Sequence, residues 1–434
     1  MKRNLEACLV AWKESFERKP LIIKGVRQCG KTYLLKKFGE KYYSDIAYFN
    51  FEETEKLKST FENDLDAHRI ISELSVFRGR KINPGTTLVI FDEIQFCSRA
   101  ITSLKYFNEN ANEYHIVCAG SLLGIALSKA FSFPVGKVDF LSLYPMSFYE
   151  FLSAADEEML CEYLANLKPE EKIPDLIHEK LVINLKKYYL IGGMPKVVDI
   201  WNKTRDIEMV EAEQQRILDG YELDFAKHAP IKEFPKLSAI WRSIPEQLSK
   251  ENSKFIFGQV RRGWRAKDLE DALEWLVRAG LVYKVCKIEK PFMLLSSYAD
   301  QTFFKLYLSD VGLLRRLSKT DPHVIFDATG TYREFKGAIT ENFVLCELVS
   351  SGSDVPYYWK SQNTAEVDFI IQVGPDILPI EVKSEKNDKA KSLAEYRKKY
   401  NPKAAVKTSM KPLSSDDQLR NIPLYLMWHM PNLL

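Results

Sequence analysis

The sequence predicts an α/β protein with a parallel sheet near the N-terminus, a helical middle part and a second α/β core near the C-terminus. Short apolar runs alternate with helical periods in the first third, which is typical of a parallel sheet. From about residue 151 to 234 the pattern becomes helical, with a polar break at 168–172. After residue 336 a helical period precedes three strand-like runs and another helix.

Composition sets the broad class of this protein. Of 434 residues, 46% are hydrophobic and 28% charged, which excludes a mostly disordered chain. Lys and Arg number 62 against 59 Asp and Glu, so any basic surface has to be local. No signal peptide is visible, and the longest apolar-leaning run, 116–127, is too short to cross a membrane. We therefore expect a cytoplasmic protein without a membrane segment.

Metal and disulfide chemistry based on cysteine is not expected. The seven cysteines are scattered and never form a CxxC pair, and the six histidines form no HExxH. Neither a disulfide framework nor a His/Cys zinc site fits this spacing.

The elements of the first third follow from apolar runs and their ends. Residues 21–24 form a short apolar strand that ends in Gly25, and 33–42 has a helical period. Residues 46–51, 87–91 and 114–119 are further strands. The uninterrupted apolar run at 87–91 is typical of a strand buried on both faces.

The turn after the first strand matches the phosphate-binding pattern GxxxxGK[ST], or Walker A. Its glycines let backbone N–H groups and the start of the next helix face phosphates. Lys31 would reach the β- and γ-phosphates, and the Thr32 hydroxyl would ligate Mg²⁺. The sequence therefore predicts ATP and Mg²⁺ as cofactors, bound by Gly25, Val26, Arg27, Gln28, Cys29, Gly30, Lys31 and Thr32.

The strand at 87–91 is followed by two adjacent carboxylates, the pattern of a Walker B motif. Asp92 would hold the hydration shell of Mg²⁺, and Glu93 would polarise the attacking water. Ser121, at the end of the next strand, is a candidate sensor of the γ-phosphate or a simple helix cap. Arg99, Lys137 and an arginine of another subunit all remain candidates for the arginine finger.

These motifs resemble a family of prokaryotic AAA ATPases, often described as archaeal-type. The resemblance covers about residues 15–155 and rests on GVRQCGKT, LVIFDEIQ, CAGSLLGIAL and FPVGKVDFLSLYPMSFYEFL. It implies an AAA fold with Lys31, Thr32, Asp92 and Glu93 in their usual roles.

The middle of the chain carries a local basic cluster. Arg261, Arg262, Arg265 and Lys267 surround Trp264, directly before a helical stripe at 268–278 and strands at 281–285 and 303–308. This order resembles a winged helix-turn-helix. The cluster could contact nucleic-acid phosphates, or it could be the solvated turn of a module used for internal packing.

The C-terminal part combines three carboxylates and a lysine at informative positions. Glu341 lies on a helix, Asp368 on the next strand, and Glu381 and Lys383 share one face of a following strand. Carboxylates of this kind can hold Mg²⁺ while the lysine orients or deprotonates water. We therefore expect Asp368 and Glu381 as metal ligands and all four residues as catalytic.

This arrangement resembles the PD-(D/E)xK core of restriction-endonuclease-like proteins over about residues 335–410. Val367 stands where that motif has proline, which supplies no ligand. The resemblance implies a metal-dependent nuclease. Two alternatives stay open: the acids are ordinary edge-strand charges, or the fold is kept for binding with little cleavage.

Residues 383–411 are strongly basic, with ten Lys or Arg against three acids. Such a surface beside a metal site suits a DNA or RNA backbone, although a solvated helix face would have the same composition. The basic residues are 383, 386, 389, 391, 397, 398, 399, 403, 407 and 411, and the acids are 385, 388 and 395.

Together these patterns predict four domains and two competing functions. The domains are an AAA-type ATPase domain at 1–155, a helical lid or linker at 156–235, a winged-helix-like domain at 236–320 and a nuclease-like domain at 321–434. The first function is an ATPase coupled to a nucleic-acid-binding or nuclease-like domain. The second is a signalling or assembly ATPase with a catalytically inert, protein-binding C-terminal domain, whose partner is another protein or a second copy.

Overall fold

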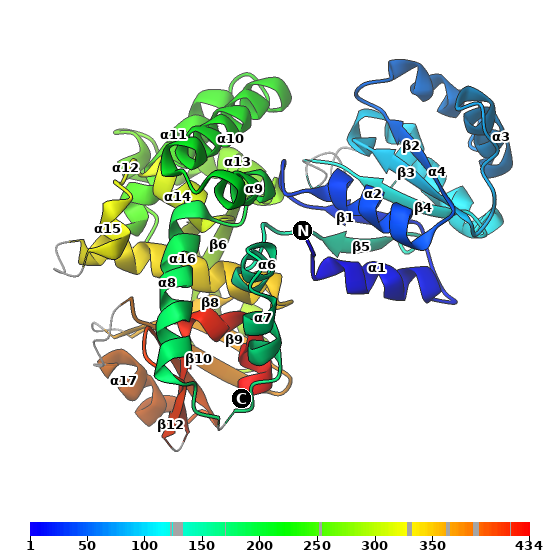
Figure 1. Cartoon of the computed structure of the whole chain (residues 1–434). Helices are drawn as coiled ribbons and strands as arrows, with labels where there is room; N and C mark the ends of the chain where they lie inside the picture. The colour runs from blue at the N-terminus through cyan, green and yellow to red at the C-terminus, as the bar shows by residue number, and fades with distance from the viewer. Residues whose placement is uncertain are drawn as a thin grey trace. The chain divides into compact units, whose positions relative to one another are not determined.

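The computed structural model describes residues 1–121, 124, 133–169, 171–250, 254–327, 332–361, 365–384, 390–416 and 418–434. Contacts within the chain divide it into two units, coloured from blue to red along the chain in Figure 1. The N-terminal unit comprises Met1–Tyr144 with Arg278–Gly280, and the C-terminal unit comprises Pro145–Val277 with Leu281–Leu434. The finer division into four domains stays a prediction.

The N-terminal unit is built on a five-stranded sheet whose neighbouring strands are all parallel. Its strand order is β2-β3-β4-β1-β5. The strands are β1 (Leu21–Lys24), β2 (Asp45–Asn50), β3 (Thr87–Asp92), β4 (His115–Ala119) and β5 (Asp139–Ser142). The helices are α1 (Leu5–Glu14), α2 (Lys31–Tyr42), α3 (Ala67–Phe77) and α4 (Ser98–Asn110), with 3-10 turns η1 (Glu55–Phe61) and η2 (Ile94–Phe96). The predicted parallel α/β fold of this part is confirmed.

Strand β5 is the element that the apolar runs did not predict. It pairs in parallel with β1 along its whole length, yet its four residues are only partly buried or exposed. β5 lies at the edge of the sheet, and neither of its faces is fully covered. Such a strand has no need of a continuous apolar run, so its sequence does not mark it. The interior strand β3, in contrast, is buried at every position.

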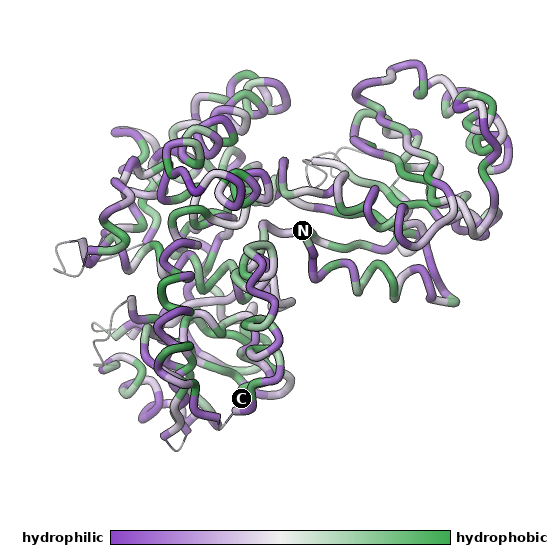
Figure 2. The backbone as a smooth tube through the Cα atoms, viewed as in Figure 1, coloured by the Kyte–Doolittle hydropathy of each residue, from purple (hydrophilic) through white to green (hydrophobic). Residues whose placement is uncertain are grey.

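The core of this unit lies between the sheet and helices α3 and α4. Alternate residues of β2, β3 and β4 join apolar residues of both helices in one buried cluster. In Figure 2, the middle of α1 is green and its C-terminal end is purple. Leu9 and Trp12 are the residues of α1 that are buried.

The C-terminal unit combines a helical part with an eight-stranded mixed sheet. Its helices are α6 (Phe148–Ala154), α7 (Glu158–Ala165), α8 (Asp175–Ile191), α9 (Pro195–Thr204), α10 (Ile207–His228), α11 (Phe234–Leu248), α12 (Phe257–Val260), α13 (Ala266–Arg278), α14 (Val311–Leu317), α15 (His323–Phe326), α16 (Arg333–Ser350) and α17 (Lys391–Tyr400). The helical run predicted for 151–234 corresponds to α6–α10. Most of α13 belongs to this unit, and its last residue, Arg278, is assigned to the N-terminal one.

The strands of this unit follow the order β12-β13-β11-β10-β9-β8-β6-β7. They are β6 (Val282–Ile288), β7 (Ala299–Leu308), β8 (Tyr357–Lys360), β9 (Glu366–Val373), β10 (Asp376–Val382), β11 (Ala405–Ser409), β12 (Ser414–Asp416) and β13 (Leu419–Pro423), with 3-10 turns η3 (Leu295–Tyr298) and η4 (Leu424–Leu433). The β6–β7 hairpin, interpreted from the sequence as a wing, joins β8 in parallel and so forms the edge of the larger sheet.

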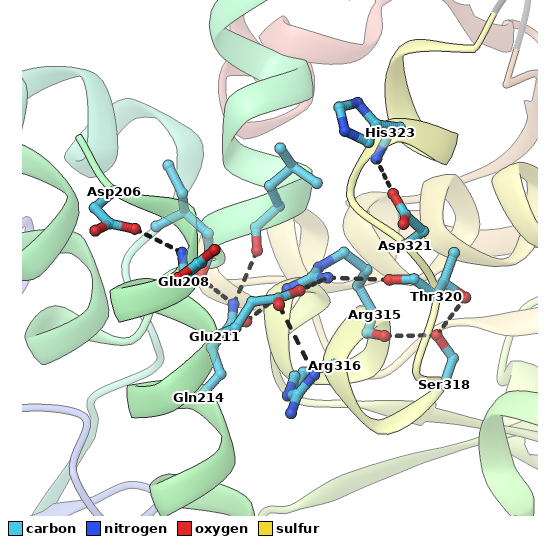
Figure 3. A network of polar contacts seen from close by, with 12 residues as sticks. Asp206, Glu208, Glu211, Gln214, Arg315, Arg316, Ser318, Thr320, Asp321 and His323 are labelled. Carbon is cyan, nitrogen blue, oxygen red and sulfur yellow. Dashed lines mark hydrogen bonds and ion pairs between the residues drawn. The ribbon is translucent and has the colours of Figure 1, made fainter.

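A buried arginine ties three helices of this unit together (Figure 3). The Arg315 side chain on α14 is fully buried and donates to Glu211 Oε1 at 2.6 Å and Gln214 Oε1 at 2.8 Å, both on α10. Gln214 in turn donates to the carbonyls of Leu190 and Ile191 at the end of α8. Because a buried charge is costly without partners, this network requires α8, α10 and α14 to pack together.

None of the helices in the described part of the chain combines the length and the apolar character that a membrane span needs.

Candidate functional site

The predicted phosphate-binding loop lies between β1 and the first turn of α2. Gly25, Gln28 and Gly30 have positive φ angles of 157°, 66° and 95°. A Cβ atom on Gly25 would lie 2.3 Å from the carbonyl oxygen of Leu143, so this position also requires glycine for space. The backbone therefore curls as the Walker A pattern predicts.

Lys31 is buried within this loop, at 7% exposure. Its Nζ atom donates to the carbonyl oxygens of Gly25 and Val26, each at 2.9 Å. The loop thus holds the ammonium group at the N-terminus of α2, where backbone N–H groups and the helix dipole also favour anions.

Asp92 ends β3 and faces the first turn of α2. Its Oδ2 atom accepts hydrogen bonds from Thr32 Oγ1 at 2.7 Å and from the Tyr48 hydroxyl at 2.8 Å. The predicted ligands Thr32 and Asp92 therefore meet where Mg²⁺ is expected, and hard oxygen ligands are those that Mg²⁺ prefers. These residues fit the metal. Tyr48 was not predicted, although it lies near the carboxyl end of β2, next to β3 in the sheet.

Glu93 is placed beside Ser121 by an unusual backbone conformation. Its φ of 49° is left-handed, and its Oε2 atom accepts from Ser121 Oγ at 3.2 Å and Gln95 Nε2 at 2.5 Å. Gln95 also lies 3.4 Å from Ser121 Oγ. The structure therefore brings the predicted base and the predicted sensor together. It adds Gln95, which was not predicted although it follows Glu93 by two residues.

The two arginine-finger candidates of this chain have partners within the N-terminal unit. Arg99 donates through Nε to the carbonyl of Phe61, and Lys137 pairs with Glu109 at 2.9 Å. Residues 122, 123 and 125–127 of the CAGSLLGIAL segment lie outside the described residues.

The C-terminal unit brings Glu341, Asp368, Glu381 and Lys383 into one cluster, which we call the carboxylate cluster. Strands β9 and β10 are antiparallel with Ile380 opposite Phe369, so Glu381 and Asp368 follow as neighbours. The Val382 N–H donates to Asp368 Oδ2 at 2.7 Å, and Lys383 Nζ lies 2.6 Å from Glu381 Oε1. Helix α16 supplies Glu341 to the same group.

Four further residues complete the carboxylate cluster and were not predicted. Tyr307 donates its hydroxyl to Glu341 Oε2 at 2.8 Å, and Lys305 Nζ lies 3.5 Å from the same oxygen. Lys305 also contacts Glu366 Oε1 at 2.7 Å, and Lys360 contacts Glu366 Oε2 at 3.0 Å. A charged residue inside the apolar run 303–308 was the one sequence signal for Lys305.

The acids of the cluster influence one another. Burial and the negative charges of Glu381 and Glu341 raise the pKa of Asp368 well above its usual range. Burial also raises the pKa of Glu381, although the Lys383 ammonium opposes this shift. Burial would lower the pKa of Lys383, but the charges of Glu381 and Asp368 outweigh it and raise that pKa. The cluster therefore concentrates negative charge that a cation would relieve.

The fit of a divalent metal to this cluster depends on Asp368 and Glu381. The buried Glu381 Oε2 atom has no hydrogen-bond partner within the described residues, as expected for a free ligand oxygen. Among those same residues, no group of three or more His, Cys, Asp or Glu is arranged to hold a metal. Mg²⁺ commonly uses one or two carboxylates and keeps several waters, so two carboxylates fit it.

The basic residues of the predicted turn at 261–267 are exposed, whereas the basic segment 383–411 is exposed in part: Lys383, Arg397, Lys407 and Lys411 are half-buried. Arg261, Arg262, Arg265 and Lys267 are exposed, and the Arg261 guanidinium lies 5.2 Å from the ring centroid of Trp264. On α17, Leu393 and Tyr396 are buried while Lys391, Lys398 and Lys399 are exposed, as the helical pattern predicts. Residues 385, 386, 388 and 389 of the basic segment lie outside the described part.

Family models match three parts of the chain. A family described as AAA domain matches residues 17–152. Two families described as domains of unknown function, DUF8612 and DUF4143, match residues 183–324 and 336–427. The N-terminal unit therefore contains an AAA-type ATPase domain.

Two relatives match most of the chain at low identity. An uncharacterized protein of Haemophilus influenzae is 24% identical over 83% of this chain and 81% of its own length. An uncharacterized protein of Methanocaldococcus jannaschii is 22% identical over 81% of this chain and 71% of its own length.

Solved structures show more distant likenesses. The Walker-type ATPase PABY2304 of Pyrococcus abyssi has a TM-score of 0.47 and 16% identity over 73% of this chain and 95% of its own. The Orc1 protein of Aeropyrum pernix, solved in complex with DNA, has a TM-score of 0.27 and 14% identity over 74% of this chain and 92% of its own. Because these values are low, the AAA domain match alone carries the assignment of the N-terminal unit.

Proposed function

We propose that this protein is a Mg²⁺-dependent ATPase whose C-terminal unit binds DNA or RNA and cleaves it at the carboxylate cluster. The observation that carries the nuclease part is the convergence of Glu341, Asp368 and Glu381 from α16, β9 and β10 with Lys383, which directly follows β10. Four residues spread over 43 positions of the sequence meet in the order that the PD-(D/E)xK resemblance implies.

In the ATPase reaction each residue of the N-terminal site has a distinct role. Lys31 and the loop N–H groups would bind the phosphates, and Thr32 and Asp92 would hold Mg²⁺, which would neutralise charge on the phosphates. Glu93 accepts a proton from the attacking water, and Ser121 and Gln95 orient its carboxylate.

In the C-terminal reaction Asp368 and Glu381 would hold the metal, which would supply Lewis-acid activation of a phosphodiester oxygen. Lys383 lies 2.6 Å from Glu381, where its ammonium can orient the attacking water or stabilise charge on the phosphate. Glu341, held by the Tyr307 hydroxyl and near the Lys305 ammonium, would add negative charge beside these ligands. The exposed lysines of α17 contact the nucleic-acid backbone.

The decisive experiment is cleavage of plasmid DNA and of RNA with Mg²⁺ or Mn²⁺, with and without ATP. Asp368→Asn and Glu381→Gln should each abolish cleavage, because either change removes a ligand charge, and ATP hydrolysis should stay within about twofold of wild type. Asp376→Asn is the matched control: it changes an acid of the same strand that pairs with Lys403. Wild-type protein that cuts neither substrate under any condition would refute the nuclease part.

A second candidate function is a signalling or assembly ATPase with an inert C-terminal unit that binds protein. The observation in its favour is that Glu381, Glu341 and Glu366 already pair with lysines of the cluster. Binding to a generic duplex at several salt concentrations separates the two functions. An affinity that does not change with salt would exclude backbone binding and favour this second function.

A further inference from the structure

The carboxylate cluster contains more acids than one divalent cation requires. Glu341, Glu366, Asp368 and Glu381 lie on α16, β9 and β10, and three lysines, 305, 360 and 383, contact them. The acids form two groups. Asp368 and Glu381 meet at the β9–β10 pair, whereas Glu341 and Glu366 meet at Lys305.

Lys305 differs from the other two lysines in burial. It is 2% exposed, whereas the side chains of Lys360 and Lys383 are 33% and 29% exposed. Its ammonium lies between Glu366 Oε1 at 2.7 Å and Glu341 Oε2 at 3.5 Å, and it also faces the ring of Tyr358 at 5.2 Å. A buried ammonium is stable only when acids enclose it in this way.

The position of Lys305 in the chain makes this arrangement specific. It lies in β7, in the middle of an apolar run whose other residues from Phe304 to Leu308 are buried. The neighbouring Tyr307 fixes Glu341 through a hydrogen bond of 2.8 Å. Strand β7 thus sends two polar groups into the cluster from outside the segment that resembles the nuclease core.

We propose that the cluster has two positions for a cation and that the Lys305 ammonium, as a built-in cation, permanently occupies the one between Glu341 and Glu366. The cluster therefore binds one divalent ion, at Asp368 and Glu381. Glu341 and Glu366 are balanced by the ammonium and take no metal of their own. This inference deepens the proposed function and rests on it for the ion at Asp368 and Glu381. Lys305 is a positioning residue, since it holds Glu341 toward that ion.

Removing the ammonium should expose the second position. In Lys305→Met, which keeps the length and apolar stem of the side chain, Glu341 and Glu366 lose their shared partner. Their charges then attract a divalent ion. We expect the full-length variant to bind two Mn²⁺ ions at the cluster, or one ion at least about tenfold more tightly than wild type.

The measurement is Mn²⁺ binding by electron paramagnetic resonance without nucleotide, so that activity is not the readout. The double variant Asp368→Asn with Glu381→Gln gives the background of all other Mn²⁺ sites, and wild type should bind one ion above it. Lys360→Met is the matched control: it contacts Glu366 from a more exposed position, and its Mn²⁺ binding should equal that of wild type.

Thermal unfolding provides a second readout. Lys305→Met should melt at a lower temperature than wild type in EDTA and recover most of the loss with Mn²⁺ or Mg²⁺, because the ion replaces the missing charge. If this variant does not fold in EDTA, the same scan is run with Mn²⁺ present from the start. Folding that requires the ion supports the inference, and a variant that stays unfolded with the ion would overturn it.

The outcomes separate the two proposals. One ion in both wild type and Lys305→Met, with equal affinity, would overturn the role of Lys305 and leave the proposed function standing. No ion in wild type but binding in Lys305→Met would support the built-in cation and overturn the metal-dependent nuclease. Two ions in wild type, or none in either protein, would overturn the inference about Lys305.

Discussion

The carboxylate of Glu93 accepts hydrogen bonds from two residues, one close to it in the sequence and one distant. Gln95 follows it in the next turn, and Ser121 comes from the end of β4. Since Glu93 already has a left-handed φ, its side chain is aimed by backbone as well as by hydrogen bonds. This fixed orientation of the Glu93 carboxylate fits the proposed role of accepting a proton from a single water molecule.

We predict that Glu93→Gln keeps nucleotide binding and slows hydrolysis by about 100-fold or more, because only the proton-accepting group is lost. Lys31→Ala should instead weaken binding, since it removes the charge next to the phosphates. Fluorescent-nucleotide binding and phosphate release measure the two effects. Hydrolysis by Glu93→Gln at the wild-type rate would show that another group activates the water.

Helix α16 contributes one acid to the carboxylate cluster and another to the packed interior. Near its middle it presents Glu341 to the carboxylate cluster, and two turns later it buries Glu347. Glu347 Oε1 accepts the Phe148 N–H at 2.9 Å, while its Oε2 has no partner among the residues that the structure describes. Burial raises the pKa of Glu347 to about 8.

This shift predicts a pH dependence of stability. Between the unfolded value of 4.5 and about 8, the folded protein keeps a proton that the unfolded chain has lost. Wild-type stability therefore falls as pH rises through this window, by about 1.4 kcal/mol per unit of pKa difference at most. Glu347→Gln lacks this titration and keeps the acceptor for Phe148. The free energy of unfolding of this variant minus that of wild type should therefore increase by a few kcal/mol as the pH rises from 5.5 to 8.5.

Urea unfolding of both proteins at pH 5.5 and pH 8.5 tests this prediction. The titration of Asp310, whose pKa burial raises to about 6, is present in both proteins and cancels from the comparison. An identical difference in unfolding midpoint at the two pH values would contradict the shift of Glu347.

At the scale of the whole molecule, the net charge is small although some surface segments are strongly positive. The chain as a whole is close to neutral, at +3. The exposed turn with Arg261, Arg262, Arg265 and Lys267 is nevertheless strongly positive, as is the exposed side of α17. A polyanion would therefore be attracted to particular surfaces rather than to the molecule at large.

Neutralising the four basic residues of the turn to Gln should weaken binding to every duplex sequence alike. Each lost phosphate contact should reduce the slope of log affinity against log salt by about 0.9. Fluorescence anisotropy at several salt concentrations measures both effects. The matched control neutralises four cations of the same unit that pair with acids: Lys203, Arg216, Arg242 and Lys250. Equal losses in both proteins would show that the turn has no special role.

The sequence predicted best what is local in the chain. The phosphate-binding loop, its strand and its helix lie within Leu21–Tyr42, and Asp92 directly ends the buried strand β3. Such motifs can be recognised in the sequence because residues close together in the chain determine the local hydrogen bonds, the start of a helix and the spacing of its apolar residues. Edge strand β5 was missed, since its residues depend for their partners on β1, more than 100 positions away.

By itself, the sequence determined the α/β class, the parallel N-terminal sheet and the identity of the residues at each motif. Tertiary structure alone decided which side chains meet. Tyr48 reaches Asp92 because β2 lies next to β3, and Lys305 reaches Glu341 and Glu366 because β7, α16 and β9 pack together. The physical reason is that a sequence motif depends on the geometry of residues that are neighbours in the chain. A cluster of buried charges depends instead on which distant residues pack together, and only the folded chain determines that.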